Sequence, residues 1–261
     1  MRCVRRTSPL AVWRELRDAD ALIFGGGTLL QDSTSLRSLL YYTALLKLAH
    51  RKGLRTELWA NGLEMPRSWL GERMIRSVLR DCSFLGLRDG RSVRLARELL
   101  GARTEIALIR QSDLALATMP CEEERLRFLQ EHYGLCNTTE GYVIAVLRGS
   151  APKGYAGAFA QWLGTLRSEG FLLLFIPMLP KEDLSASLQM ARELGGTVAC
   201  GLGASDVVGL ASKARLVCGM RLHALVFAAA AGTPFVGFGG DPKIESFCRE
   251  NGGVYFTDLY H

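Results

Sequence analysis

The stretch RLVCGMRLHALVFAAAAGTPFVGF, residues 215–238, decides the fold class. Arg215–Cys218 and Phe235–Phe238 are short runs rich in apolar residues, as buried strands are, and the apolar segment between them has the length of a helix. Gly232 and Pro234 punctuate the chain before the second run. A strand, a helix and a strand in this order predict a βαβ unit with parallel strands.

The same alternation extends over the whole chain. Besides the two runs above, the expected strands are Ala21–Phe24, Leu54–Ala60, Ser83–Leu87, Glu105–Ile109, Tyr142–Leu147, Phe171–Ile176 and Thr197–Cys200. Amphipathic segments between them predict helices, among them Ser35–Lys52 with Gly53 as its C-cap, and Arg88–Gly101 with Asp89 as its N-cap. Because the strands are apolar on both faces, we expect parallel sheets that helices cover on both sides.

One segment interrupts this pattern. Residues 117–124, ATMPCEEE, bring a proline and an acidic triplet just before a helix. We place the domain boundary there, which gives an N-terminal domain over 1–118 and a C-terminal domain over 119–261. The predicted fold class is therefore α/β, with two Rossmann-like open parallel sheets facing each other across a cleft.

Composition excludes several classes of protein. Of 261 residues, 48% are hydrophobic and 22% charged, which excludes intrinsic disorder and disulfide mini-scaffolds. The net charge of +6 suits anionic ligands, but no basic block indicates nucleic acid. The seven cysteines are at least fifteen positions apart, so no CxxC pair exists, and the four histidines form no zinc pattern. No apolar stretch has the length of a membrane span or a signal peptide, so we expect a cytoplasmic protein.

A run of glycines follows the first predicted strand. Gly25, Gly26 and Gly27 would let backbone amides approach a ligand closely, or would simply form a tight turn. The run is not a dinucleotide fingerprint, since G-x-G-x-x-G requires glycine where Leu30 stands. Among the polar residues that follow, Asp32 is a ligand contact or a cap of the next helix.

Two arginines stand at the carboxyl ends of predicted strands, where open α/β sheets bind ligands. Arg88 begins a helix after the strand Ser83–Leu87, and its planar guanidinium matches phosphate or carboxylate. The alternative is a surface ion pair with Asp89. Arg148 follows the strand Tyr142–Leu147, and the alternative for it is an exposed loop residue.

The sharpest feature is Gly219-Met-Arg-Leu-His223, which places two cationic side chains at a strand-to-helix junction among apolar neighbours. Because burial of an unpaired guanidinium is costly, we expect Arg221 to have an anionic partner, either Asp241 or a ligand. His223 is a functional residue or a satisfied core histidine. Further on, Pro242 suits the first position of a helix that Asp241 would cap, which leaves Lys243 open to bind a ligand.

Together these residues give the sequence a resemblance. The motifs that carry it are LIFGGGTLLQDSTS at 22–35 with SLLYY at 38–42, LRDGRS at 87–92, GMRLHAL at 219–225 and DPK at 241–243. In this order they resemble the bacterial polysaccharide pyruvyl transferases, particularly the cell-surface (S-layer) anchoring type. Two departures stand out: the family's opening strand with its Gly-Asp loop has no counterpart, so we expect an incomplete first domain, and Gly240 stands where the family commonly has tyrosine.

The resemblance implies a fold like that of GT-B glycosyltransferases. It also implies transfer of a pyruvyl group from phosphoenolpyruvate to two hydroxyls of a sugar, such as N-acetylmannosamine in a cell-wall precursor, as a cyclic ketal. Arg88, Arg221 and His223 would bind the donor and act in catalysis, and Leu222 would line the donor site. A lipid-linked precursor as acceptor would place the protein at the inner face of the membrane.

The residues suit this chemistry. Phosphoenolpyruvate carries a phosphate and a carboxylate, which Arg88 and Arg221 from opposing domains would clamp. His223 is the natural acid to protonate the methylene carbon, and Asp32 is the candidate base; no cofactor or metal is required. The alternatives are a sugar-nucleotide glycosyltransferase, a nicotinamide dehydrogenase, which the broken fingerprint disfavours, and a non-catalytic binding homologue.

Overall fold

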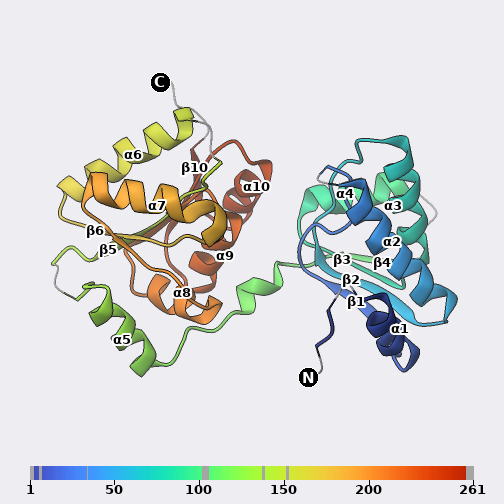
Figure 1. Cartoon of the computed structure of the whole chain (residues 1–261). Coiled ribbons are helices and arrows are strands. Elements are labelled where there is room, and N and C mark those ends of the chain that lie inside the picture. Colours follow the sequence, from blue (N-terminus) through green and yellow to red (C-terminus); the bar gives the residue numbers. More distant parts are fainter. Residues whose placement is uncertain are drawn as a thin grey trace. The chain divides into compact units, whose positions relative to one another are not determined.

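The computed structural model describes residues 3–5, 8–33, 35–101, 106–136, 139–150 and 153–256. The chain divides into two compact units, Met1–Leu114 and Ala115–His261. Each unit contains one parallel β-sheet with helices packed on it (Figure 1). Within the described ranges, no helix combines the length and the apolar character that crossing a bilayer requires.

The first unit has a four-stranded sheet in the order β1-β2-β3-β4, with every neighbouring pair parallel. Its strands are β1 (Ala21–Gly25), β2 (Arg55–Asn61), β3 (Phe84–Leu87) and β4 (Ala107–Arg110). Its helices are α1 (Pro9–Arg17), α2 (Leu36–Arg51), α3 (Trp69–Asp81) and α4 (Gly90–Leu100), and the short 3-10 helix η1 (Leu114–Ala117) leads into the second unit. Asp89 caps α4 as predicted, because its carboxylate accepts a hydrogen bond from the Ser92 amide.

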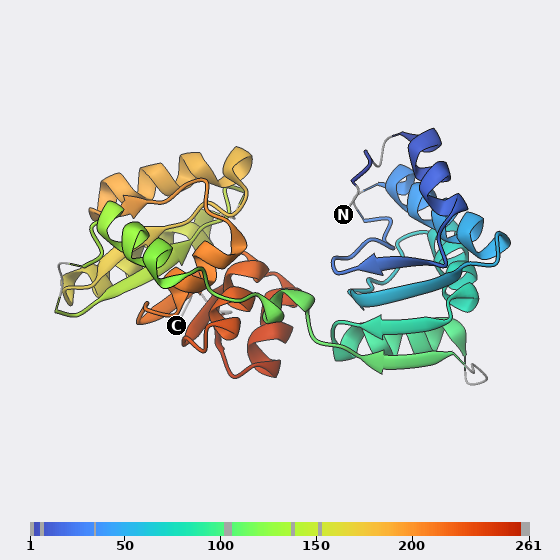
Figure 2. The same cartoon turned by 90° about the horizontal axis from the view of Figure 1, so that it is seen from below.

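Helices cover only one face of this first sheet. Each strand pairs with its successor in one direction, and right-handed crossovers then place every connecting helix on the same side. Accordingly α2 contacts α3 and α3 contacts α4, above a core that includes Leu58 and Leu85 (Figure 2). On the opposite face Ile23, Trp59 and Ile109 are 52%, 38% and 49% exposed. The expectation of helices on both faces is therefore wrong for this sheet, as far as the described residues show.

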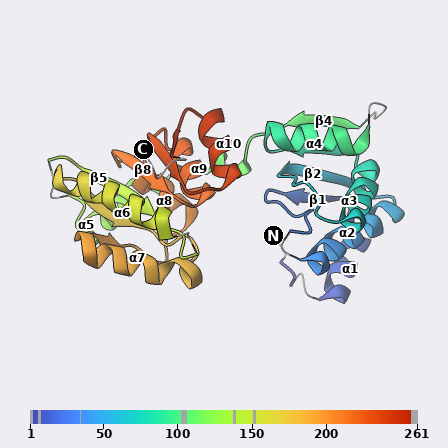
Figure 3. The same ribbon diagram turned by 90° about the horizontal axis from the view of Figure 1, so that it is seen from above.

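The second unit has a six-stranded parallel sheet in the order β10-β9-β8-β5-β6-β7. Its central strands β5 and β8 are labelled in Figure 3. Its strands are β5 (Tyr142–Val146), β6 (Leu172–Phe175), β7 (Thr197–Val198), β8 (Leu216–Gly219), β9 (Phe235–Phe238) and β10 (Val254–Phe256). Its helices are α5 (Glu123–His132), α6 (Lys153–Ser168), α7 (Pro180–Leu194), α8 (Ala204–Ala211), α9 (Leu222–Ala230) and α10 (Pro242–Glu250).

Helices cover both faces of this second sheet, as its apolar strands predict. Successive residues of β5 belong to different cores: Ile144 packs with Val208 of α8 and Leu225 of α9, whereas Ala145 packs with Phe159 of α6. All five residues of β5 are buried. Such two-sided burial is what makes this strand a continuous hydrophobic run in the sequence.

The strand order reverses beside β5. The chain moves from β5 outward to β6 and β7, then returns through α8 to β8 on the other side of β5. Connections that leave a sheet in opposite directions from neighbouring strands open a crevice at their carboxyl ends, where ligands of open α/β proteins bind. The residues that directly follow β5 and β8 include Arg148 and Arg221.

Candidate active site

In the second unit, a buried carboxylate holds Arg221, the residue that precedes α9. The Nε and Nη2 atoms of Arg221 donate to the two carboxylate oxygens of Asp183 at 3.1 and 2.6 Å, and Nη2 also donates to Glu182 at 2.7 Å. Burial lowers the pKa of the Arg221 guanidinium, but these carboxylates raise it above its usual range. Arg221 is therefore charged.

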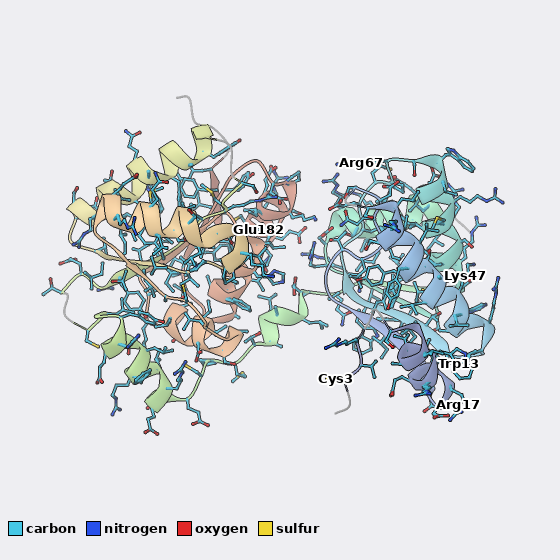
Figure 4. The ribbon with its side chains drawn as sticks, in the orientation of Figure 1. Cys3, Trp13, Arg17, Lys47, Arg67 and Glu182 are labelled. Carbon is cyan, nitrogen blue, oxygen red and sulfur yellow. The ribbon has the colours of Figure 1, made fainter. Side chains whose placement is uncertain are left out.

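The partner of Arg221 corrects the sequence-based prediction. Asp241 was the protein residue expected to pair with it, but Asp183 and Glu182 at the start of α7 do so (Glu182 is labelled in Figure 4). Asp241 instead caps α10 by accepting a hydrogen bond from the Lys243 amide at 2.9 Å, as predicted. Its other oxygen lies 3.9 Å from Nη1 of Arg148.

Asp183 ties together the loops around the strand reversal. Its side chain is 0% exposed, and it also accepts hydrogen bonds from the amides of Gly149, after β5, and Leu179, before α7. The loops are closely packed here, since a Cβ atom on Gly149 would overlap the Glu182 carbonyl. One carboxylate thus joins the segments that follow β5, β6 and β8.

Part of Arg221 stays available to a ligand. Its side chain is 16% exposed, and its Nη1 atom donates no hydrogen bond to the residues that the structure describes. A guanidinium carries five N–H donors, two of them on Nη1. The arrangement presents a charged, fixed nitrogen at the strand reversal.

His223 lies in the first turn of α9, two residues after Arg221, and is exposed. Its ring contacts that of Phe227 one turn later, with centroids 6.2 Å apart. The structure therefore does not place His223 in the core, which was the alternative to a functional role. Leu222 precedes it and packs partly buried against the core of the unit.

Two other predicted cationic residues of the second unit, Arg148 and Lys243, follow strands on either side of β8. Arg148 follows β5 and is 43% exposed, with its Nε donating to the Ser150 hydroxyl at 3.1 Å. Lys243 is the second residue of α10. Arg148 and Asp241 link the ends of β5 and β9, on either side of the β8 segment that carries Arg221.

In the first unit, Arg88 directly follows β3 and is largely but not fully buried, with 10% of its side chain exposed. Its nearest carboxylate oxygens are those of Asp113, 3.7 Å from Nη1, and Asp89, 3.8 Å from Nε. At these distances the groups form ion pairs but not hydrogen bonds. The guanidinium therefore donates no hydrogen bond to the described residues. The ion pair with Asp89, the alternative to a ligand-binding role, is therefore present, although neither side chain is fully exposed.

The glycine run lies beside Arg88. A Cβ atom on Gly62 would stand 2.7 Å from Nη2 of Arg88 and 2.8 Å from the Thr28 hydroxyl, so the guanidinium packs on this backbone. The Gly62 amide in turn donates to the Gly27 carbonyl at 2.8 Å. Gly26 and Gly27 have positive φ, which glycine adopts without strain, while Gly25 ends β1. Both readings of the run, tight turn and ligand loop, agree with this geometry.

Asp32 has a different setting from the one expected. Ser35, not Asp32, is the N-cap residue of α2. The Asp32 carboxylate accepts hydrogen bonds from the amides of Arg67 and Ser68 at 2.8 and 2.9 Å and from the Ser68 hydroxyl at 2.7 Å. Although burial raises the pKa of Asp32, these bonds lower it below its usual range. A carboxylate with both oxygens occupied and a lowered pKa is a poor general base, and these contacts favour a structural role.

We therefore predict that Asp32→Ala destabilises the first unit by about 1–2 kcal/mol, since three hydrogen bonds to the loop before α3 are lost at a partly exposed site. Folding lowers the pKa, so the contribution of the carboxylate is complete above the unfolded pKa of about 3.9 and disappears as pH falls through the folded value. Urea unfolding at pH 7 and pH 3 measures both effects. If Asp32→Ala lowered the free energy of unfolding by the same amount at both pH values, this role would be contradicted.

The sequence analysis missed several residues of these two regions. Asp183 and Glu182 lie in the first turn of α7 after Pro180, and the signal for them was a helix that begins with two acids shortly after a buried strand. Asp113 lies three residues after the end of β4, the strand next to β3. Asn61, at the end of β2, is 2% exposed, and its Oδ1 atom accepts no hydrogen bond from the residues that the structure describes.

Comparisons with known proteins agree on family and fold. A family model described as polysaccharide pyruvyl transferase matches residues 2–242, nearly the whole chain. No curated protein matches the sequence.

Solved structures of GT-B type share the fold. UDP-GlcNAc 2-epimerase from Neisseria meningitidis, bound to UDP-GlcNAc, has a TM-score of 0.62 at 12% identity, over 96% of this chain and 67% of the epimerase. The epimerase from Methanocaldococcus jannaschii has a TM-score of 0.66 at 11% identity, over 95% and 69%. Anabaena HepE in complex with UDP-glucose has a TM-score of 0.52 at 13% identity, over 88% and 65%. At these identities the likeness concerns the fold alone.

Proposed function

This chain belongs to the polysaccharide pyruvyl transferase family, and from that premise we propose that it transfers a pyruvyl group from phosphoenolpyruvate to two hydroxyls of a sugar. The product is a cyclic ketal on a polysaccharide precursor, with N-acetylmannosamine as the candidate acceptor. The observation that carries the proposal is that a fixed guanidinium, Arg221, and an exposed imidazole, His223, lie two residues apart at the strand reversal of the second sheet.

The donor is recognised by its two anionic groups. Arg221 would offer Nη1 to a phosphate or carboxylate oxygen while Asp183 holds its other nitrogens. Arg88 is buried at a strand end with unused donors, which suits charge-assisted hydrogen bonds to an anion. Arg148 and Lys243 add positive charge in the second unit, where Glu182, Asp183 and Asp241 add negative charge.

His223 would act as the general acid. Protonation of the donor's methylene carbon by His223 breaks the C=C double bond and leaves a cationic carbon. The first sugar hydroxyl attacks this carbon, and its proton returns to His223. Cleavage of the C–O bond to phosphate then allows the second hydroxyl to attack the same carbon. The proton of the second hydroxyl goes to the released phosphate. An imidazole nitrogen can both give up a proton and accept one, which is what this role requires of His223.

No carboxylate is needed as a base for the hydroxyl protons. Asp32 was the candidate, but its carboxylate is occupied by the Arg67 and Ser68 segment. The proposal therefore routes no proton through Asp32. Asp32→Asn, which keeps the size of the side chain, is expected to retain the turnover of the wild type once folded.

The direct test is incubation of the purified chain with phosphoenolpyruvate and acceptors that contain N-acetylmannosamine. We expect free phosphate and an acid-labile ketal in equal amounts, measured by a phosphate assay and by mass spectrometry. Parallel incubations with UDP-sugars test the glycosyltransferase alternative. Sugar transfer from a UDP-sugar, with no phosphate released from phosphoenolpyruvate, would reject the proposal.

A further inference from the structure

We propose that Asp183 is the positioning residue of the donor site: it fixes the plane of the Arg221 guanidinium so that Nη1 alone is offered to the donor anion. The inference deepens the proposed function and rests on it where donor binding is concerned. Asp183 touches neither donor nor acceptor in this account. It acts through Arg221, to which it is joined by two hydrogen bonds.

The geometry of the pair supports this role. Nε and Nη2 of Arg221 lie on two different oxygens of one carboxylate, which is the bidentate arrangement that sets the orientation of a guanidinium as well as its distance. Three of the five N–H groups of Arg221 are then directed at Asp183 and Glu182. The two that remain belong to the same nitrogen, Nη1.

The anchor itself is rigid. Asp183 has no exposed surface, and two backbone amides, those of Gly149 and Leu179, hold its oxygens from segments 34 and four residues away in the sequence. Each carboxylate oxygen therefore accepts two hydrogen bonds, one from a backbone amide and one from Arg221. The amides hold the carboxylate in place independently of Arg221. The segments after β5 and β8 are consequently held at one distance from each other.

Glu182 provides an internal comparison. It contacts the same guanidinium, through Nη2, but its side chain is 56% exposed. Exposed ion pairs contribute little to stability or orientation, whereas a buried, fully hydrogen-bonded carboxylate fixes its partner. Glu182 therefore occupies one N–H group of Arg221, whereas Asp183 sets the plane of the guanidinium.

The experiment is a double-mutant cycle on the KM for phosphoenolpyruvate. Asp183→Asn is expected to raise this KM about tenfold or more, with a smaller change in kcat, because orientation toward the donor is lost. In an Arg221→Lys background, the same substitution should change KM less than twofold, since lysine cannot use a bidentate anchor. Asp183→Asn effects of equal size in both backgrounds would overturn the proposal.

Loss of stability must be separated from loss of positioning. Asp206 pairs with Arg125 through two hydrogen bonds of 3.1 Å in the same unit and also accepts one from the Gly203 amide. Asp206→Asn thus removes a comparable pair away from Arg221, and it should leave KM unchanged. Thermal unfolding of each variant shows whether a KM effect occurs in folded protein.

A second readout does not depend on activity. In nitrogen-15 NMR spectra, the Nε–H group of Arg221 should exchange slowly with water in the wild type and rapidly in Asp183→Asn, while Asp206→Asn leaves it slow. Rapid exchange in the wild type, or slow exchange in Asp183→Asn, would refute the anchoring. If the anchoring is observed but phosphoenolpyruvate neither binds nor reacts, the proposed function fails and the positioning of Arg221 by Asp183 stands.

Discussion

Replacing His223 by alanine is expected to lower kcat for pyruvyl transfer by a factor of about 10² to 10⁴, the usual contribution of a positioned general acid. His223 is exposed at the start of α9, so its removal opens no cavity and leaves no buried group unpaired. Folding should therefore be intact. Initial rates of phosphate release at saturating phosphoenolpyruvate measure the effect.

His132 supplies the matched control. It is also an exposed histidine on a helix, the last residue of α5, and its ring stacks on that of Phe128. His132→Ala should retain wild-type turnover. Wild-type turnover in His223→Ala would contradict the assignment of the acid, and a similar loss in both variants would show that the effect is not specific to the site.

The second large effect is expected from Arg88→Lys, which should weaken binding of phosphoenolpyruvate about 10- to 100-fold. A charge-assisted hydrogen bond contributes about 1.5–3 kcal/mol, and 1.4 kcal/mol corresponds to a factor of ten. Lysine keeps a positive charge near the buried Asp113 but loses the planar fork. Arg88→Ala is less informative, because it would leave Asp113 without this counter-charge. Calorimetric titration measures the change.

Arg94 serves as the control for this substitution. It lies on the exposed face of α4, six residues beyond Arg88. Arg94→Lys should therefore bind phosphoenolpyruvate as the wild type does. Unchanged affinity in Arg88→Lys would remove Arg88 from the donor site and leave its buried guanidinium with a purely structural role.

Much of the fold follows from local patterns in the sequence. All nine predicted strands are present, most with ends within two residues of the expected ones, because each is an apolar run between clear turn signals. Part of the strand expected at Glu105–Ile109 lies outside the described residues. The strand that was missed, β10, is an apolar run of only three residues with two exposed positions, which is too short to predict a strand.

Long-range arrangements could not be predicted in the same way. Which face of the first sheet the helices cover depends on the strand order, which local patterns do not give. Ile23 and Trp59 are exposed, although their apolar side chains predict burial. The pairing of Arg221 with Asp183 joins residues 38 positions apart, and nothing in the local pattern favoured Asp183 over the nearer Asp241. Asp32 likewise found its partners 35 and 36 residues away.

The residue types at strand ends were nevertheless informative. Arg221 was singled out because a guanidinium among apolar neighbours requires an anion, and Arg88 because it stands at the carboxyl end of a strand. Both side chains are largely buried next to carboxylates. That requirement identifies where charge is concentrated. It does not tell whether protein or ligand supplies the counter-charge, and the unused Nη1 of Arg221 shows that one guanidinium can serve both.

The central claim is that fixed guanidinium groups of this chain bind the two anionic groups of phosphoenolpyruvate, and isothermal titration of the wild type and of Arg221→Lys with this compound tests it most directly. We predict saturable binding to the wild type that weakens at least tenfold in the variant and also weakens at high salt. Absence of binding to the wild type, or equal affinity in the two proteins, would contradict the account.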